Sequence, residues 1–507
     1  MLLDLDRLPG LLLAALPETV LTVWAMLLLL DAAWHHREPR AQRRAAALAL
    51  VGIALAAAAA AWLWAAHASV AGLATSLAVD GFRFAVDLIV LLSAALSVLL
   101  SVDYLEREAI LVPEYYVLIL FAAVGMMLLA AGEDLFVMFL GLELMSISVY
   151  VLSGIDRRSR VGGEAALKYF LLGAFASAFL LYGIALVYGA TGSTKLGIIA
   201  SQIASLRLAG HPLLLAGLAL LLVGFAFKVA AVPFHMWTPD VYDGAPTPVS
   251  GFMSTAVKAA AFAALLRVLL SGFIGLHGVW EQVVWWLAAV TMVVGNLVAL
   301  AQRSLKRMLA YSSIAHAGYL LTAVVAGSTA GAAAFLFYLL FYTLMTVGAF
   351  AILALKGRGG ERDVLVDDLA GLAESHPWLA LGLTVCMLSL LGFPGTAGFI
   401  GKWYILVAAT GGGYSVLAAI LVLTSVVSAG YYLPVVMAMY MKPSAHEQSH
   451  AGVAVPRLAG ATLAVMVAAL LVFGFWPNRA MDAARAGSHA FLPTGVPTIA
   501  APVPVAN

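Results

Sequence analysis

The sequence predicts an all-α polytopic membrane protein with 14 transmembrane helices, in which two inverted five-helix repeats (spans 4–8 and 9–13) each contain one broken helix, spans 7 and 12. Three observations support this prediction. Of the 507 residues, 64% are hydrophobic and 10% are charged, whereas an ordinary soluble protein has about 25% charged residues. Fourteen apolar runs reach the length of about 20 residues that a helix needs to cross a bilayer. Two of these runs are interrupted by proline or glycine close to a lysine.

The apolar runs are distributed along the whole chain. The segment MLLDLDRLPG at the start has two aspartates and no small-residue cleavage site, so we expect the first run to be a retained span rather than a cleaved signal peptide. The predicted spans are 9–33, 45–67, 84–104, 114–131, 134–154, 163–189, 212–240, 248–271, 279–301, 307–327, 330–355, 378–410, 414–441 and 456–476.

The two interrupted runs predict how these spans are organised. Span 7 has Pro233 past its middle, and span 12 contains LGFPGTAGFIGK, which ends at Lys402. Breaks of this kind are tolerated in a membrane only where the freed backbone groups face protein or a wet cavity. Spans 7 and 12 are five apart, so a five-helix unit would be repeated, and an odd-numbered unit inverts. The predicted segments are 1–110 (three N-terminal helices), 111–272 and 273–445 (the two repeats) and 446–507 (the last span and a tail).

The distribution of basic residues predicts the orientation. Loops after the odd-numbered spans hold 16 Lys and Arg residues, and loops on the other side, in which we count Arg83, hold six. Cytoplasmic loops are enriched in basic residues, so we expect both termini on the non-cytoplasmic side. The five basic residues left over lie within spans: Lys168, Lys228, Lys258, Arg267 and Lys402.

Ionisable residues deep in a span cost about 2.5–3.5 kcal/mol each and are functional candidates by default. Glu143 lies near the middle of span 5, and Lys228 and Lys258 lie near the centres of spans 7 and 8. The structural alternative for Glu143 is a protonated carboxyl bonded to a nearby serine or carbonyl. Lys168 lies about one turn inside span 6, where its side chain can instead reach the interface.

Two histidines are further candidates for proton transfer, because histidine titrates near neutral pH. His235 follows the break in span 7, where the alternative is a helix-end histidine bonded to a carbonyl, and His316 lies beside Ser313 and Tyr319 in span 10. Neither has a second His, Cys or carboxylate at ligand spacing, so we predict no metal site.

Other residues near span ends have simpler interpretations. Arg267 lies near the outer end of span 8, and we expect it to be an interfacial anchor, since arginine does not readily release its proton. Trp237, Trp280 and Tyr242 also lie near span ends, and we expect them in the aromatic belts at the membrane interfaces.

A buried lysine and a buried carboxylate can together load and unload a proton. Burial disfavours the charged lysine and a nearby carboxylate favours it again. A pair about 4 Å apart is worth about 4 kcal/mol at an effective dielectric constant of 20. Making or breaking a pair between Glu143 and Lys228 is therefore a switch of a useful size for proton transport.

The sequence excludes several classes of function. The net charge of +1 offers no basic stripe for nucleic acid. Cys386 is the single cysteine, which excludes clusters held by several thiolates. The chain has no phosphate-binding loop, nucleotide fingerprint or nucleophile with an evident base, so the energy for transport must come from a partner.

Five segments carry a resemblance to a known family. They are FKVAAVPFHMWTPDVYDGAPTPV, GFMSTAVKAAAF, LGLELMSISVY, EAALKYFLLGAFASAFLLYGIALVYGATG and SLLGFPGTAGFIGKWYI. In order and spacing, from span 4 to span 13, they resemble the antiporter-like membrane subunits of proton-pumping NADH:quinone oxidoreductase (respiratory complex I), and within that family the group called subunit N. The resemblance implies a 14-helix subunit of two inverted repeats that translocates protons while electrons pass from NADH to quinone elsewhere.

The resemblance also implies roles for individual residues. Glu143 resembles the glutamate that pairs with the span-7 lysine, here Lys228. Lys258 matches a lysine that relays protons toward the centre, and Lys402 matches the ionisable residue of the broken span 12. Lys168 matches the span-6 lysine that separates the N and L groups from the M group. The family often has two prolines at the span-12 break, where this chain has proline followed by glycine, which can still open the helix.

The resemblance further implies partners and a location. No cofactor is expected in this chain, because NADH, FMN, iron–sulfur clusters and quinone belong to partner subunits. The expected partners are other complex I membrane subunits, especially subunits M, K and J, together with the lipid bilayer, in a bacterial inner membrane. Three alternatives remain open at this point: a subunit of an Mrp-type cation/proton antiporter, a non-conducting scaffold, and a polytopic enzyme that acts on lipid.

Overall fold

The computed structural model describes residues 8–35, 40–70, 76–357, 365–443 and 455–489. Four arginines counted for the orientation (Arg7, Arg37, Arg358 and Arg362) and the end of the predicted tail lie outside these residues. The helices that precede the break in span 7 are α1 (Leu8–Ala14), α2 (Leu16–His35), α3 (Ala41–Val70), α4 (Gly81–Arg107), α5 (Glu114–Ala131), α6 (Leu135–Ser153), α7 (Arg160–Thr191), α8 (Leu196–Ser205) and α9 (Pro212–Val229).

The second part of the chain contains the remaining helices. They are α10 (Trp237–Gly244), α11 (Thr247–Phe252), α12 (Lys258–Arg267), α13 (His277–Ala299), α14 (Leu305–Val325), α15 (Thr329–Lys356), α16 (Leu372–Ser375), α17 (Pro377–Leu391), α18 (Ala397–Gly411), α19 (Ser415–Met441), α20 (Arg457–Phe475) and α21 (Asn478–His489). Two π-helical segments, η3 (Met253–Val257) and η4 (Val268–Gly272), flank α12.

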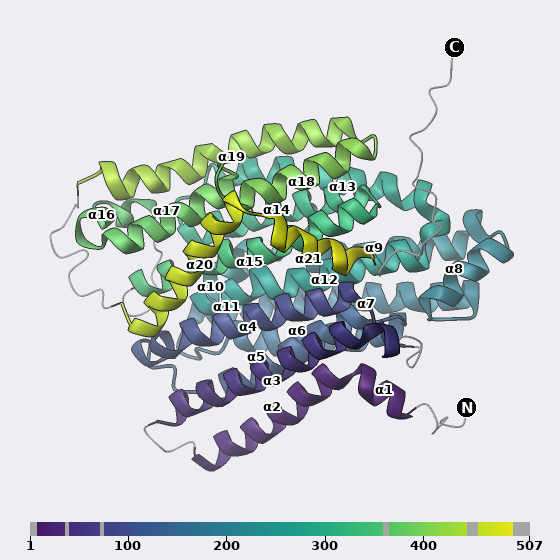
Figure 1. Ribbon diagram of the computed structural model, residues 1–507, viewed down its shortest axis with the longest axis horizontal. Helices are drawn as coiled ribbons and strands as arrows, with labels where there is room; N and C mark the ends of the chain where they lie inside the picture. Colours follow the sequence, from purple (N-terminus) through teal and green to yellow (C-terminus); the bar gives the residue numbers. More distant parts are fainter. Residues whose placement is uncertain (1–7, 36–39, 71–75, 358–364, 444–454, 490–507) are drawn as a thin grey trace.

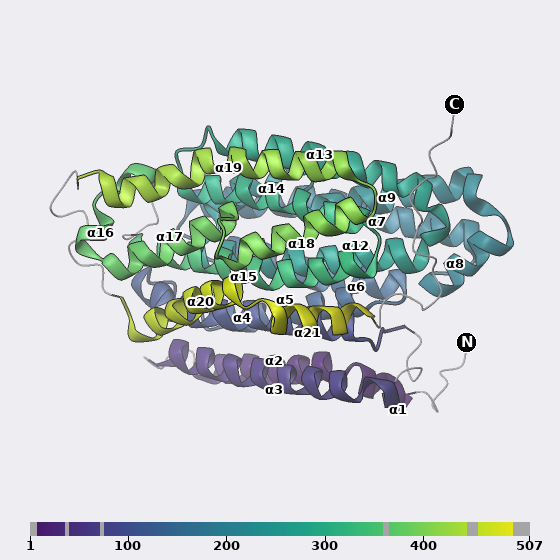
Figure 2. The ribbon, with the colours of Figure 1, turned by 45° about the horizontal axis from the view of Figure 1, so that its top comes forward.

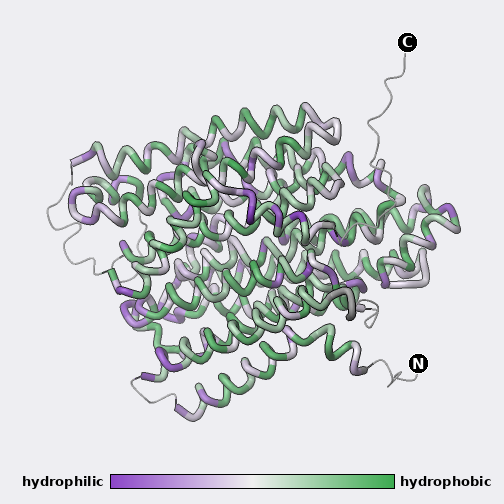
Figure 3. The backbone as a smooth tube through the Cα atoms, viewed as in Figure 1, coloured by the Kyte–Doolittle hydropathy of each residue, from purple (hydrophilic) through white to green (hydrophobic). Residues whose placement is uncertain are grey.

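The span count agrees with the prediction of a polytopic helical membrane protein. In the described residues, 13 helical segments are long and apolar enough to cross a membrane. The remaining predicted span, span 12, is divided into α17 and α18, each of 15 residues. The long helices run side by side (Figure 1), and the hydrophilic residues gather mainly at helix ends and in loops (Figure 3).

The N-terminal helices form a distinct part of the bundle. Figure 2 shows α2 and α3 as a layer beside the rest of the molecule. α4 packs against α3 on one side and against α5 and α15 on the other, so it joins this layer to the central helices. The short helix α21, which we did not predict, packs against α4 and α15.

Glycines allow close helix packing at equivalent places in the two predicted repeats. A Cβ at Gly125 of α5 would lie 2.3 Å from the backbone nitrogen of Met145 in α6. A Cβ at Gly295 of α13 would likewise lie 2.7 Å from the backbone nitrogen of Ala315 in α14. Small residues let membrane helices approach backbone to backbone. The first two helices of each repeat are thus paired in the same way, while the boundaries of the four segments stay a prediction.

The break in span 7 is confirmed, and tertiary contacts satisfy its backbone. α9 ends before Ala230, which is held in the left-handed region with φ 61°. The indole N–H of Trp237 donates to the carbonyl of Phe227 at 3.0 Å, and the N–H of Val232 donates to the hydroxyl of Thr291 at 2.9 Å. These bonds replace those that the helix loses, so the chain can open at this depth.

The break in span 12 is also confirmed, and it depends on glycine. Gly392 and Gly395 have φ angles of 86° and 89°. Proline holds φ near −65°, so a second proline could not take the conformation of Gly395. The helix is therefore still broken although this chain lacks the second proline, because Gly395 adopts a left-handed conformation at that position.

Several expectations about span ends were wrong. Arg83, which we counted in an outer loop, lies in the first turn of α4 and is fully buried. Arg267 is not an interfacial anchor but is 1% exposed and bonded to acidic residues. Trp237, Tyr242 and Trp280 are likewise buried within the protein rather than placed in a belt, because the helices around them enclose the helix break and the start of α13.

Candidate functional site

The ammonium group of Lys228 lies at the end of α9, beside the break. It donates to the hydroxyl of Ser146 at 2.7 Å and to that of Tyr150 at 3.3 Å, and the residue is 1% exposed. The ring centroids of Tyr150 and Tyr169 lie 5.3 and 5.6 Å from the ammonium nitrogen. Hydroxyl acceptors and aromatic faces can both stabilise a buried cation.

The expected contact between Glu143 and Lys228 is not formed in this structure. Among the described residues, the ammonium nitrogen of Lys228 has two hydroxyl partners and no ion pair with a carboxylate oxygen within 4.0 Å. Glu143 nevertheless acts on the ammonium electrostatically, and its Oε1 is buried without a hydrogen-bond partner among the described residues. Ser146 lies one turn after Glu143 on α6, so the lysine contacts the serine on the face that also carries the glutamate.

Aromatic side chains enclose the region between Lys228 and the break. The rings of Tyr169 and Trp237 are stacked with centroids 4.4 Å apart and an interplanar angle of 6°. The edge of Tyr242 contacts Trp237 at 6.0 Å between centroids. The buried hydroxyls of Tyr169 and Tyr242 have no hydrogen-bond partner among the described residues. Such hydroxyls are available to bind water or pass on a proton.

Lys258 is the first residue after the π-helical segment η3. Its ammonium donates to the carbonyl of Ser313 at 2.7 Å and also to the hydroxyl of the same serine. Lys258 is 1% exposed. π-helical turns inside α-helices occur frequently at functional sites, because they re-aim the side chains around them. The turn here directs Lys258 at α14.

His316 lies one turn after Ser313 on α14 and connects two tyrosines. Its Nδ1 lies 2.5 Å from the hydroxyl of Tyr338, and its Nε2 lies 3.2 Å from the hydroxyl of Tyr432. The ammonium groups of Lys258 and Lys402 both act on the imidazole electrostatically. The structure therefore brings His316 into the region between these two lysines.

Lys402 lies in the broken span 12, near the start of α18. It donates to the carbonyl of Leu391 at 3.0 Å, a group left at the end of α17 by the break. Its ammonium nitrogen lies 4.6 Å from the ring centroid of Tyr319, which is one turn after His316. Ser313, His316 and Tyr319 thus form a stripe on α14 from Lys258 to Lys402.

Two predicted candidates, Lys168 and His235, belong neither to this stripe nor to the groups that contact Lys228. Lys168 lies at the surface of the chain, with a 44% exposed side chain that pairs with Glu164 at 2.7 Å and with Asp240 at 3.1 Å. Asp240 also pairs with Arg307 at 2.9 Å. His235 lies in the turn between α9 and α10, and its Nδ1 has no hydrogen-bond partner among the described residues.

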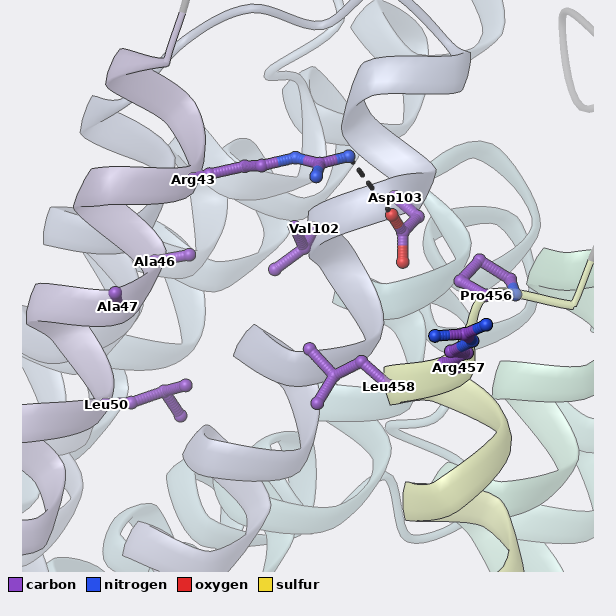
Figure 4. A pocket seen from close by; sticks show the side chains of 9 residues that line it. All are labelled: Arg43, Ala46, Ala47, Leu50, Val102, Asp103, Pro456, Arg457 and Leu458. Carbon is purple, nitrogen blue, oxygen red and sulfur yellow. Dashed lines mark ion pairs between the residues drawn. The ribbon is translucent and has the colours of Figure 1, made fainter.

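Two cavities lie away from the buried lysines. One of about 320 Å³ is lined mainly by the ends of α3, α4 and α20, with Arg43 facing Asp103 at 3.6 Å (Figure 4). The other, of about 420 Å³, is lined by Asp80, Glu133 and Lys195 at the opposite end of α4. In the part of the chain that the structure describes, no three His, Cys, Asp or Glu side chains could hold a metal ion.

Comparison with known proteins agrees with this arrangement. A sequence profile described as "NADH:quinone oxidoreductase/Mrp antiporter, TM" matches residues 132–428. NADH-quinone oxidoreductase subunit N of Gemmatimonas aurantiaca is 48% identical over 498 residues, which cover 96% of this chain and 95% of the relative. The chain belongs to the NADH-quinone oxidoreductase subunit N family. Subunit N of Trichlorobacter lovleyi is also 48% identical, over 82% of this chain and 85% of its own length.

Solved structures place this subunit N family member in a wider fold group. A chain of respiratory complex I from Thermus thermophilus with bound aureothin has a TM-score of 0.77 and 40% identity, covering 93% of this chain and 100% of its own length. A chain of the Mrp complex from a Dietzia species has a TM-score of 0.80 at 22% identity, covering 94% and 98%. The second match shows a shared fold alone.

The sequence did not identify all the groups that contact the buried lysines. Ser146 and Tyr150, the acceptors for Lys228, lie within the quoted motif LGLELMSISVY, one and two turns after Glu143. Helical spacing could have found them, because residues three, four and seven apart share a face. Tyr432 has no such signal, since it reaches His316 from α19.

Proposed function

We propose that this chain translocates protons across the membrane as a subunit of NADH:quinone oxidoreductase, driven by electron transfer in other subunits. The observation that supports the proposal is a set of four buried basic groups, each of which can hold or release a proton: Lys228, Lys258, His316 and Lys402. Lys228, Lys258 and His316 each contact side-chain hydroxyls, and Lys402 contacts the carbonyl of Leu391 at the second break. In this proposal the electron transfer takes place in other subunits, and this chain takes part in proton transfer.

Each residue has a role in this proposal. Glu143 acts on Lys228 through its charge, and approach of the carboxylate would hold the proton on the lysine, while separation would release it. Lys258 passes the proton toward His316 through the hydroxyl of Ser313, which takes up the proton of the ammonium and releases its own. Lys402 receives it at the second break, where free carbonyls and water can reach the ammonium.

The energies involved match the work of proton transport. Moving one charge through about 100 mV takes about 2.3 kcal/mol. Making or breaking a charge pair about 4 Å apart changes the energy by about 4 kcal/mol at an effective dielectric constant of 20. Closing and opening the Glu143–Lys228 contact can therefore move a proton against such a potential.

Two further candidates act at the edges of this path. Lys168 pairs with Asp240, close to the start of α10, and we assign it a place at the entrance of the first repeat. His235 lies in the break itself and is positioned to exchange protons with water that enters there. Their exposure fits an entry role better than a central one.

The partners and location follow from the same proposal. The Thermus thermophilus relative is a chain of respiratory complex I, so we place this chain among the membrane subunits of such a complex, next to subunit M and the small subunits K and J. NADH, FMN, iron–sulfur clusters and quinone belong to the partners, and this chain holds none. It lies in a bacterial inner membrane with both termini on the non-cytoplasmic side.

Two alternatives differ from this proposal in function. A subunit of an Mrp-type antiporter would have the same fold, but the identity is 22% to the Mrp chain and 48% to subunit N of Gemmatimonas aurantiaca. A scaffold without transport would tolerate the loss of the buried charges.

Replacing Lys258 by methionine tests the proposal. Methionine keeps the length of the side chain and removes the charge, so we expect the complex to assemble while NADH-driven acidification of inverted membrane vesicles slows severalfold. Lys442→Met is the control, because Lys442 is 56% exposed and pairs with Asp367 at the surface. Assembly of the Lys258 variant with undiminished acidification would leave the scaffold as the better account.

A further inference from the structure

A second buried group of ionisable side chains lies in the N-terminal helices, apart from the path proposed above. Arg83 of α4 donates to both carboxylate oxygens of Glu18 in α2, at 2.6 and 2.8 Å, and to the carbonyl of Ala78 at 2.7 Å. Asp87, one turn along α4, lies 3.3 Å from the Nε of the same arginine. Arg83 and Asp87 are 0% exposed and Glu18 is 3% exposed.

The carboxyl group of Asp87 is not satisfied by the protein. Neither of its oxygens has a hydrogen-bond partner among the described residues, and the nearby Nε–H of Arg83 is not aligned with it. Glu18, by contrast, accepts two good hydrogen bonds from the guanidinium. Arg83 therefore lies beside two acidic side chains but forms well-aligned side-chain hydrogen bonds with Glu18 alone.

Charge balance decides the state of this group. Two ionised carboxylates against a single guanidinium would leave one negative charge buried without compensation, which is highly unfavourable. Glu18 holds the better hydrogen bonds to the cation, so it is the ionised partner. The proton that balances the group then resides on Asp87.

This group continues to the surface through Asp80. Its Oδ1 accepts from the backbone N–H of Arg83 at 2.8 Å, and its Oδ2 accepts from Arg267 at 2.7 Å. Arg267 also donates to Glu133 at 2.9 Å. Asp80 and Glu133 line the cavity of about 420 Å³. The buried acid and the cavity are thus parts of one charged network at this end of α4.

We infer that Asp87 is a proton-exchange site that carries a proton at neutral pH and exchanges it with the cavity through Asp80 and Glu133. The charged groups that face Asp87 are Arg83 on its own helix, Glu18 on α2 and Asp80 before α4. In the exchange, the O–H bond of Asp87 breaks and an O–H bond forms on a carboxylate of Asp80 or Glu133. The guanidinium of Arg83 then shares its hydrogen bonds between Glu18 and the new Asp87 carboxylate. This doubly ionised state is the unfavourable one described above, so it is short-lived and ends when a proton returns to Asp87 from the side of the cavity.

The position of α4 connects this site to the proposed path. Farther along α4, the hydroxyl of Ser93 bonds that of Thr255 at 2.7 Å. Thr255 belongs to η3, which ends immediately before Lys258. Arg267 closes the same helix α12 that begins with Lys258. A change in the charge of Asp87 therefore occurs close to η3 and α12, the helices that hold Lys258. This connection to Lys258 is the one part of the inference that rests on the proposed function.

Infrared spectroscopy of the purified complex tests the inference. A protonated carboxyl group gives a C=O stretching band that a carboxylate lacks, so we expect Asp87→Asn to remove one such band at neutral pH. The matched control is Asp103→Asn, because Asp103 lies at the other end of α4 and pairs with Arg43. Labelling of aspartate side chains with carbon-13 should shift the same band, and labelling of glutamate should leave it in place.

Glu18→Gln supplies an independent variant. Without the charge of Glu18, Arg83 is free to neutralise Asp87, so the band should disappear although Asp87 is still present. Transfer of the unmodified complex into heavy water should shift the band quickly, because the acid exchanges with the cavity.

The outcomes separate this inference from the proposed function. A band that persists in Asp87→Asn, or that does not shift in heavy water, would overturn the exchange site. A band that behaves as expected in a complex whose Lys258→Met variant pumps normally would instead overturn the proposed function and leave the site standing.

Discussion

The ammonium nitrogen of Lys228 lies 2.7 Å from the hydroxyl oxygen of Ser146 on the neighbouring helix α6. The buried cation is therefore held by a neutral acceptor, while Glu143 acts on it from a longer distance. A neutral acceptor is easier to leave than a carboxylate, because no opposite charges have to be separated when the lysine moves away from it. In the proposed path, the lysine is therefore held in a way that allows its proton to move.

Ser146→Ala should destabilise the charged form of Lys228, because it removes a hydrogen bond to the ammonium group. Loss of a hydrogen bond to a charged group costs about 1.5–3 kcal/mol, so we expect slower NADH-driven acidification of inverted vesicles. Ser148→Ala is the matched control, because the hydroxyl of Ser148 donates only to the carbonyl of Leu144 in its own helix. Equal pumping by both variants would contradict the role of Ser146.

Tyr338→Phe should interrupt the connection between Lys258 and Lys402. It removes the hydroxyl that lies 2.5 Å from His316 but keeps the ring, which is stacked on the imidazole. We expect pumping to slow severalfold in a complex that assembles normally, because a neighbouring relay group is lost while the packing remains.

Tyr182→Phe is the control for this experiment, because Tyr182 is 60% exposed on α7, a helix that contributes none of the groups bonded to His316. The measurement is the initial rate of dye quenching in inverted vesicles, normalised to the NADH oxidation rate. The proposal for Tyr338 fails if both variants slow pumping equally.

The sequence was informative where the signal was local. Lys228 beside Pro233, and Lys402 after the glycine-rich segment, are combinations that no plain membrane anchor needs, and the structure places both lysines at helix breaks. The same holds for His316, because Ser313 and Tyr319 share its helical face. Short-range spacing therefore predicted the depth of these groups and their setting.

The sequence was misleading where contacts form between distant helices. Glu18 and Arg83 are 65 positions apart, and nothing in either segment indicates that they meet. Trp237 and Tyr242 were misplaced because proximity to a predicted span end normally means proximity to the interface. After a helix break that rule fails, since the chain resumes inside the protein.

Gly398→Ala should disrupt the break in span 12. A Cβ at this position would lie 1.9 Å from the carbonyl oxygen of Ser389. The Cβ is attached directly to the backbone of α18 and the carbonyl belongs to the backbone of α17, so neither can move easily. Overpacking of this kind costs about 1–3 kcal/mol or more. We expect a lower thermal midpoint for the purified complex and slower pumping.

Gly411→Ala is the matched control on the same helix. No atom lies within 4 Å of a Cβ at Gly411, so this substitution should leave the thermal midpoint unchanged or raise it slightly, because it reduces the freedom of the unfolded chain. An equal loss for both variants would show that helix α18 as a whole, rather than the close contact at Gly398, sets the stability.

The network around Arg267 should make stability depend on pH in two opposite ways. Burial alone would raise the pKa of Asp80, but Arg267 and the backbone N–H of Arg83 outweigh it and hold that pKa below its usual range. Burial raises the pKa of Glu133, and Arg267 offsets this only in part. A lowered acid pKa adds stability that is lost as the pH falls through the folded value, whereas a raised one adds stability that is lost as the pH rises through it.

Glu133→Gln should therefore flatten the pH dependence of stability above the ordinary glutamate pKa of about 4.3. In the parent protein, folding favours the neutral form of Glu133, so its contribution to stability falls as the pH rises above that ordinary value. Glutamine stays neutral throughout, which removes this slope, while the acid-side loss due to Asp80 remains below the ordinary aspartate pKa of about 3.9. Thermal unfolding of the purified complex across this range measures the slope, with the exposed Glu374→Gln as control. An unchanged slope in Glu133→Gln would contradict this prediction. It would mean that the carboxyl group of Glu133 in the parent protein is already ionised across this range, because Arg267 stabilises the carboxylate more than burial destabilises it.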